Sequence, residues 1–160
     1  MTSVGGTRAV QDPAGFTEAA ALLMDFNREY DYPVPEWDWL AVHLGTLVTS
    51  GDTSVLMFGT PAIGVAVLRF RIATLSADPE AYLAEFYIQP GLRGKGYGTT
   101  FLDDVIQHAR RRGATYMDLN TSEDDEAARH VYEKRGFDCH EGNGEGPKAL
   151  YYELELDPVE

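Results

Sequence analysis

Residues 82–112 constrain the fold of this chain more than any other stretch, because they predict a strand, a glycine-rich turn and a helix in that order. The run at 82–88 is rich in aromatic side chains, which favour β-strands. After the turn at 93–98, apolar residues recur at spacings of three and four, the pattern of an amphipathic helix. Backbone amides at the start of such a helix are free to bind an anion, and the helix dipole favours the negative charge. The stretch therefore predicts a phosphate-binding site.

The glycine spacing in the turn, Arg-Gly-Lys-Gly-Tyr-Gly, narrows the kind of phosphate site. A P-loop needs Ser or Thr directly after Gly-Lys, but Gly96 stands there. The dinucleotide fingerprint Gly-x-Gly-x-x-Gly, started at Gly94, needs a third glycine where this chain has Thr99. Neither common nucleotide signature is met, and the pattern that remains is Arg-x-x-Gly-x-Gly.

A second stretch, residues 127–137, reads Ala-Ala-Arg-His-Val-Tyr-Glu-Lys-Arg-Gly-Phe. Together with the Arg-x-x-Gly-x-Gly motif and the strand before it, this stretch resembles the GNAT superfamily of acetyl-CoA-dependent N-acetyltransferases. The resemblance covers about residues 80–140, and before that it rests on element order alone. The family often has Asn three residues before the alanine of its second motif, where this chain has Asp125, so the coenzyme or capping contact of that position falls to Asp125.

The resemblance implies an α/β fold with a mixed, mainly antiparallel sheet of six or seven strands, flanked by four helices and splayed beside the central strand. Since domains commonly run about 100–200 residues, 1–160 is expected to form a single domain. The first predicted elements are two helices at about 13–30 and 35–48 and a hairpin at 54–71. The central strand with its helix follows at 82–112, and a further strand and helix at 115–135. Two closing strands are predicted from Phe137 and at 149–156.

The chain has 26 acidic and 13 basic residues, a net charge of −13. Nucleic acid needs a basic binding face, so the charge argues against that partner. An acidic cleft would attract a cationic amine, although acidity also keeps a protein soluble without any role in binding. The four histidines and Cys139 share no metal-ligand spacing, so no metal site is predicted.

No run of 18 apolar residues exists, and the first residues lack the pattern of a secretion signal, so no membrane association is predicted. The single cysteine, Cys139, excludes an internal disulfide and fits a reducing compartment. We therefore expect a cytoplasmic protein.

The resemblance assigns the coenzyme contacts mainly to two adjacent segments. Main-chain amides of the turn at 93–98 are expected to hold the pyrophosphate of acetyl-CoA. The preceding strand is expected to bind the pantetheine arm, with the backbone N–H of Ile88 facing the thioester carbonyl. The full set of expected coenzyme-binding residues is Phe86, Tyr87, Ile88, Arg93, Gly94, Lys95, Gly96, Tyr97, Gly98 and Asp125.

Glu85 is the candidate general base, because it is the only acid in an otherwise apolar strand. An unpaired carboxylate there is costly to ionise, and its pKa tends to rise. The family often has Glu at a matching position, acting directly or through water. The alternative is structural: Glu85 forms an ion pair with Arg69 or Arg71 on a neighbouring strand.

Tyr132 matches the family's tyrosine, whose hydroxyl protonates the departing sulfur, although a core tyrosine on an amphipathic helix fits the same spacing. In the family the two N-terminal helices form one wall of the acceptor site, which places Glu29 and Asp31 near an incoming amine. A solvated helix face is the alternative for each of these two acids.

These observations predict an N-acetyltransferase that moves an acetyl group from acetyl-CoA to a primary amine of a small, cationic molecule, by direct attack in a ternary complex. Two alternatives stay open: an enzyme acting on a peptide or protein amine, and a module that senses acyl-CoA without turnover. Dimers are common in the family, so a homodimer is a candidate state. The acceptor and the acyl length do not follow from the sequence.

Overall fold

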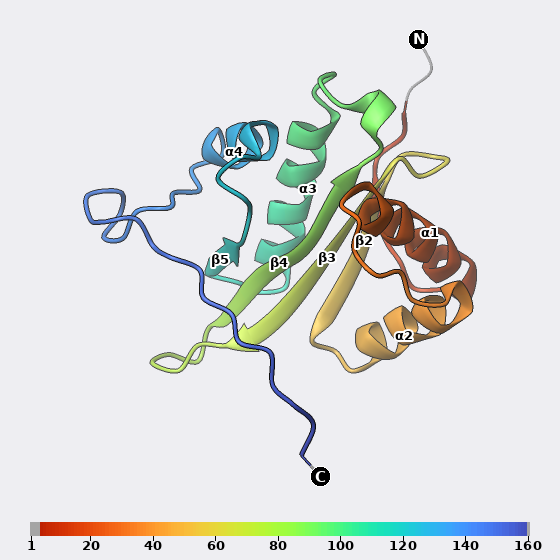
Figure 1. Cartoon of the computed structure of the whole chain (residues 1–160), viewed down its shortest axis with the longest axis horizontal. Coiled ribbons are helices and arrows are strands. Elements are labelled where there is room, and N and C mark those ends of the chain that lie inside the picture. Colours follow the sequence, from red (N-terminus) through yellow and green to blue (C-terminus); the bar gives the residue numbers. More distant parts are fainter. Residues whose placement is uncertain (1–3, 160) are drawn as a thin grey trace. The chain divides into compact units, whose positions relative to one another are not determined.

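The structure, a computed structural model, describes residues 4–159 (Figure 1). The chain divides into two compact units, Met1–Leu119 and Asn120–Glu160, and each is described by itself. Across the described residues, no helix has both the length and the apolar character that crossing a membrane requires.

The first unit contains a five-stranded sheet in the order β1-β2-β3-β4-β5, in which all neighbours are antiparallel except β4 and β5. The strands are β1 (Thr7–Ala9), β2 (Thr53–Phe58), β3 (Gly64–Ile72), β4 (Pro79–Ile88) and β5 (Tyr116–Leu119). The helices are α1 (Pro13–Glu29), α2 (Trp37–Thr49), the 3-10 helix η1 (Pro90–Leu92) and α3 (Tyr97–Arg111). The predicted α/β class and mixed, mainly antiparallel sheet are confirmed.

Helices α1 and α2 cover one face of the sheet, and α3 covers the other (Figure 1). Helix α1 begins as predicted: the Asp12 carboxylate accepts from the N–H of Gly15 at 2.8 Å, and Pro13 is the first helical residue. Its apolar side packs into one buried cluster with the sheet. The main members of that cluster are Phe16, Ala19, Ala20, Leu22 and Leu23 of α1, Leu44 of α2, and Val55, Met57, Val65, Val67 and Tyr87 of the sheet.

Phe101 of α3 is the centre of the packing on the opposite face. It is fully buried, with its ring centroid 5.4 Å from that of Phe58 and 5.3 Å from that of Phe86. Because Phe86 belongs to β4, this aromatic stack fixes the helix that follows the glycine-rich turn to the strand that precedes it.

Arg112 anchors the C-terminal end of α3 to the start of β2. One Nη atom donates to Ser54 Oγ at 3.0 Å, and the other donates to the Gly51 carbonyl. The guanidinium carbon also lies 4.1 Å from the centre of the Phe70 ring. This anchoring adds to the favourable interaction that a basic residue makes with the C-terminal end of a helix.

The second unit contains α4 (Glu126–Glu133). Asp125 caps this helix, because its carboxylate accepts from the N–H of Ala128 at 3.0 Å. The capping contact expected at this position is thus made by Asp in place of the family's Asn.

Two closing strands are predicted from Phe137 and at 149–156, and the structure has neither. Among its described residues, the second unit has only an isolated antiparallel bridge between His140 and Lys148. A strand needs a ladder of hydrogen bonds with a neighbour, and three successive residues of positive φ at 142–144 form a loop there instead. The sheet of the described chain therefore has five strands and not the predicted six or seven.

Packing between β3 and β4 leaves no room for a side chain at Gly64. An added Cβ would lie 2.6 Å from Cδ1 of Ile88 and 3.0 Å from the carbonyl oxygen of Tyr87. We therefore expect Gly64→Ala to lower the free energy of unfolding by about 1–3 kcal/mol, measured by urea denaturation. The control is Gly91→Ala, whose Cβ would meet no atom within 4 Å. Equal stability of the two variants would contradict this packing.

Candidate functional site

Strand β4 loses its neighbour β5 halfway along its length. The parallel pairing ends at Leu83 and Leu119. At the same point the register with β3 shifts by one residue, which makes Ala84 the extra residue of a β-bulge. Within the part of the chain that the structure describes, residues 84–88 thus have no strand partner on the β5 side.

The direction of the backbone groups along β4 follows from one hydrogen bond. The N–H of Gln89 donates to the carbonyl of Ile63, beside the start of β3, at 2.9 Å. Because N–H groups alternate in direction along a strand, those of Ile88 and Phe86 point away from β3, toward the unpaired edge. The N–H of Ile88, expected to face a thioester carbonyl, is therefore directed to an edge where no strand competes for it.

The turn at 93–98 leads into α3 and leaves its backbone amides without partners. Gly94 and Gly96 have φ of 75° and 86°, in the left-handed region that glycine adopts without strain. Across residues 4–159, no N–H group from Gly94 to Thr99 has a hydrogen-bond acceptor. An added Cβ at Gly94 or Gly96 would meet no atom within 4 Å. Free amides and open space at a helix N-terminus fit a phosphate group.

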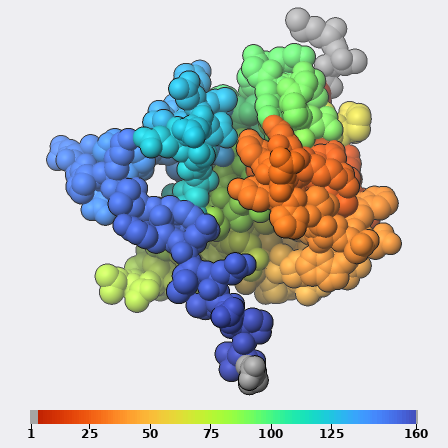
Figure 2. All heavy atoms as spheres, viewed as in Figure 1, coloured from red at the N-terminus to blue at the C-terminus, as the bar shows by residue number. Residues whose placement is uncertain are grey.

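Arg93 and Glu29, which the sequence assigns to two different ligands, bind each other. Arg93 Nη1 donates to Glu29 Oε1 at 2.6 Å, and Nη2 donates to Oε2 at 2.7 Å. Hydrogen bonding to Glu29 raises the pKa of Arg93 above its ordinary value. Figure 2 shows the segment that follows α1 (orange) directly beside this turn (green). Lys95, the other cation of the turn, has no hydrogen bond or ion pair within the described chain.

Asp31 lies just past α1 in the left-handed conformation, with φ of 55°. The N–H of Tyr32 donates to the carbonyl of Asn27 at 2.9 Å, and that of Asp31 donates to Arg28 at 3.3 Å, the two bonds of a Schellman motif. The motif places the exposed rings of Tyr30 and Tyr32 beside each other, with centroids 6.5 Å apart. Asp31 therefore stands between two tyrosines at the end of the helix.

An aromatic row connects this helix end to β4. The Phe26 ring lies 5.4 Å from Tyr30 and 5.2 Å from Tyr87, measured between centroids. Sequence reasoning selected the acids of this region and missed the rings. The signal was present, because Phe26 and Tyr30 are four residues apart on one helix and face an aromatic strand.

Glu85 lies on the face of the sheet that α1 and α2 cover, paired with Val67 of β3, a member of the core cluster on that face. Burial raises the pKa of the Glu85 carboxyl. The predicted ion-pair alternative is not found: Arg69 contacts Asp52 at 3.9 Å, and Arg71 contacts other carboxylates. Within residues 4–159 Glu85 has no hydrogen-bond or ion-pair partner.

Tyr132 of the second unit is buried, with its ring 5.9 Å from that of Phe137 in an edge-on arrangement. Both residues belong to the second sequence motif. In the same unit, Asp138, Cys139 and His140 each place one potential ligand atom within 4.8 Å of the others, although no metal site is predicted there. All three side chains are exposed, and His140 Nδ1 already lies 2.8 Å from Asp138 Oδ1.

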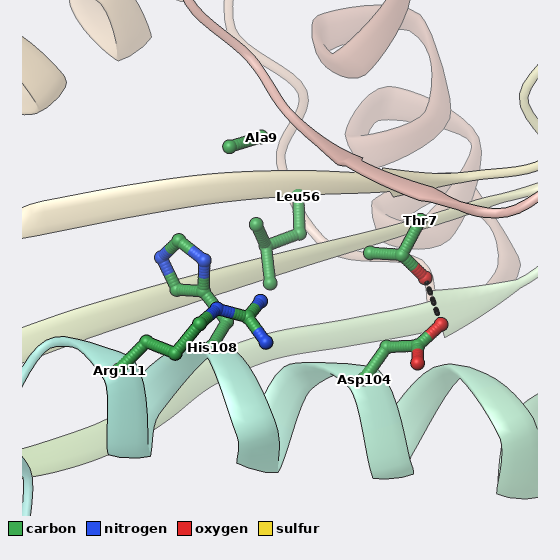
Figure 3. A pocket seen from close by; sticks show the side chains of 6 residues that line it. All are labelled: Thr7, Ala9, Leu56, Asp104, His108 and Arg111. Atoms are coloured by element: carbon green, nitrogen blue, oxygen red, sulfur yellow. Dashed lines mark hydrogen bonds between the residues drawn. The ribbon is translucent and has the colours of Figure 1, made fainter.

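A separate hollow of about 350 Å³ lies between β1, β2 and α3 in the first unit (Figure 3). None of its lining residues is among the predicted site residues. Three of its polar side chains have partners within the protein: Thr7 Oγ1 donates to Asp104 at 2.6 Å, and His108 Nε2 lies 2.8 Å from Ser54 Oγ. The hollow is distinct from the turn and the unpaired edge of β4.

Comparison with known proteins gives one family. The sequence model of the acetyltransferase (GNAT) family matches residues 16–137. A candidate acetyltransferase from Arthrobacter sp. FB24, solved by crystallography, is 38% identical over 98% of this chain and 99% of that chain, with a TM-score of 0.85. An uncharacterized N-acetyltransferase of Methanocaldococcus jannaschii is 27% identical over 67 residues, which are 42% of this chain and 30% of that protein, so the match spans less than a third of that relative.

A more distant structure shares the fold alone. It is an aminoglycoside acetyltransferase from an uncultured soil metagenomic sample, solved in complex with sisomicin. It is 15% identical, the alignment covers 93% of this chain and 95% of that chain, and the TM-score is 0.71.

The isolation of Glu85 predicts an unusual effect of pH on stability. Because burial raises its pKa, the native state favours the neutral carboxyl; this stabilisation is complete below the ordinary value of 4.5 and is lost as the pH rises through the raised pKa. We expect Glu85→Gln to unfold at higher urea concentration than the wild type at pH 8, and at the same concentration at pH 4.

Glu80→Gln is the matched control for this comparison, because Glu80 lies on the same strand and contacts Arg71 at 2.8 Å. It should be no more stable than the wild type at pH 8. A destabilised Glu85→Gln at pH 8 would mean that the carboxylate has a stabilising partner after all.

Proposed function

The chain belongs to the acetyltransferase (GNAT) family and is an acyltransferase, and from this premise we propose that it transfers an acetyl group from acetyl-CoA to a primary amine of a small, cationic molecule. The attack is direct, within a ternary complex. The observation that carries the proposal is the run of unpartnered amides from Gly94 to Thr99, at the end of a strand whose edge is unpaired.

In this proposal the turn and the edge of β4 bind different parts of the coenzyme. The N–H groups of 94–99 and the Lys95 ammonium hold the pyrophosphate, because anions bind where backbone donors and positive charge converge. The edge of β4 at Ile88, beyond the end of its pairing with β5, binds the pantetheine arm by adding backbone hydrogen bonds. Acetyl-CoA, when bound, supplies a thioester that an amine can attack.

Two groups of β4 act on the reacting atoms. Glu85 accepts a proton from the acceptor's ammonium, which converts it into a nucleophilic amine; its raised pKa supports this role, because a base works best when its pKa is closer to the operating pH. The N–H of Ile88 donates to the carbonyl oxygen, where negative charge develops during attack. Glu85 directly follows the bulge at Ala84, and Ile88 is the last residue of the same strand.

Tyr132 completes the proposed reaction by donating its phenolic proton to the departing sulfur. The support for this role is its place in the second family motif, and the buried state of its ring agrees with a fixed side chain. None of the proposed steps uses a metal ion.

The acceptor is proposed to be cationic because the end of α1 combines acids with exposed aromatic rings. The Asp31 carboxylate attracts an ammonium group, and the faces of Tyr30 and Tyr32 favour the same charge. Glu29 is less suited, since Arg93 occupies both of its oxygens. The distant likeness to an aminoglycoside acetyltransferase places aminoglycosides, with polyamines and basic peptides, in the acceptor screen.

The coenzyme is tested by calorimetric titration with acetyl-CoA, with ATP and NAD as controls. We expect saturable binding of acetyl-CoA alone. Gly96→Ala should weaken it at least about tenfold, because a strained cap misdirects the amides. Gly113→Ala is the matched control: its φ of 87° imposes the same kind of strain at the other end of α3, away from the turn. Equal affinity of the two variants would mean that the turn does not hold the coenzyme.

Substitutions of Glu85 and Tyr132 should affect different kinetic steps. We expect Glu85→Gln to lower kcat by about 10²–10⁴-fold at neutral pH, the usual contribution of a general base. Tyr132→Phe should slow thiol release while the calorimetric affinity for acetyl-CoA stays near that of the wild type. An unchanged rate in either variant would remove the role of that residue.

A further inference from the structure

Arg93 is held by its own chain on several sides. Its Nη1 and Nη2 atoms donate to both oxygens of Glu29, and its Nε atom donates to the carbonyl of Ile88 at 2.8 Å. The guanidinium carbon also lies 5.5 Å from the centre of the Tyr87 ring. A planar fork that meets a carboxylate with two parallel bonds is directional as well as strong.

The contacts of Arg93 join three elements. Glu29 is the last residue of α1, Ile88 is the last residue of β4, and Arg93 is the first residue of the turn at 93–98. The side chains of Arg93 and Glu29 are 39% and 28% exposed, so solvent screens the pair only in part. The start of the turn is therefore fixed to both the helix and the strand.

This arrangement leaves Arg93 poorly suited to bind phosphate. The Glu29 carboxylate neutralises its charge at hydrogen-bond distance, and three of its five N–H groups are used. The amides of the turn, in contrast, have no acceptors within residues 4–159. The pair and the amides thus have different tasks: one fixes the turn, and the others face the ligand.

We propose that Glu29 and Arg93 are a positioning pair, which holds the amides of 94–99 in the direction that coenzyme phosphate requires and contacts no ligand itself. The inference rests on the proposed coenzyme site. It also removes Glu29 from the acceptor wall, and it connects coenzyme binding to the position of the α1 end, where Tyr30, Asp31 and Tyr32 lie.

The direction in which Glu29→Gln changes the affinity for acetyl-CoA distinguishes this proposal from direct phosphate binding by Arg93. If Arg93 were a phosphate ligand, Glu29→Gln would free its charge, remove a nearby negative charge, and leave acetyl-CoA binding equal or tighter. If the pair positions the turn, Glu29→Gln weakens binding, although it removes a negative charge beside an anion site. We expect a loss of about five-fold, typical of a partly exposed ion pair.

The experiment measures acetyl-CoA affinity by calorimetry and steady-state kinetics for Glu29→Gln, Arg93→Gln and the double variant. The KM for acetyl-CoA should rise about five-fold in Glu29→Gln while kcat at saturation changes less than about two-fold. The double variant should be no weaker than Arg93→Gln alone, because the two residues act through one contact. Glu29→Asp keeps the charge but shortens the reach, and should lose part of the affinity.

Glu80→Gln is the matched control, because it breaks an Arg–Glu pair at the other end of β4 and should leave acetyl-CoA affinity unchanged. Wild-type affinity in Glu29→Gln, tighter binding, or additive losses in the double variant would each overturn the positioning pair. A wild-type protein that does not bind acetyl-CoA would instead overturn the proposed function, so the two failures are distinguishable.

Discussion

Backbone hydrogen bonds that the chain leaves unmade are the constraint on which the rest of the structure depends. The first N–H groups of a helix have no acceptor within the helix, and at an exposed turn such as 94–96 water or a ligand must accept from them. Here the separation of β4 from β5 after Leu83 frees the strand edge, and the left-handed glycines free the helix start. Phe101 then holds α3 against β4, so the two sets of donors stay side by side.

Glu85 is a side chain that likewise has no hydrogen-bond or ion-pair partner within the described residues. A half-buried carboxylate without an ion-pair partner works against stability near neutral pH, and the raised pKa is the measure of that cost. The nearby arginines do not relieve it, because Arg69 and Arg71 contact other acids. An isolated carboxylate at the bulge is thus costly for folding, and the proposed role of Glu85 in proton transfer gives a reason for that cost.

Short-range patterns in the sequence predicted most of the first unit. The start of α1 at Pro13, the glycine-rich turn and the amphipathic α3 are each decided by neighbouring residues, and the structure places all three as expected. The two closing strands were predicted but are not found among the described residues, because strand pairing depends on a distant partner, which alternation at 149–156 does not specify. The Glu29–Arg93 pair was missed for the same reason: 64 positions separate the two residues, and each was judged by its own neighbours.

The proposed phosphate site, composed of main-chain amides, would have an evolutionary consequence. No single side-chain replacement deletes an N–H group unless it introduces proline, so the groups that face the ligand are indifferent to most mutations. Only the residues that set the backbone angles, such as Gly94 and Gly96, are sensitive. Substitutions at the other positions of this turn should therefore be tolerated as long as its glycines are kept. For the same reason, few point mutations would give resistance to an inhibitor that copied the phosphates of the coenzyme.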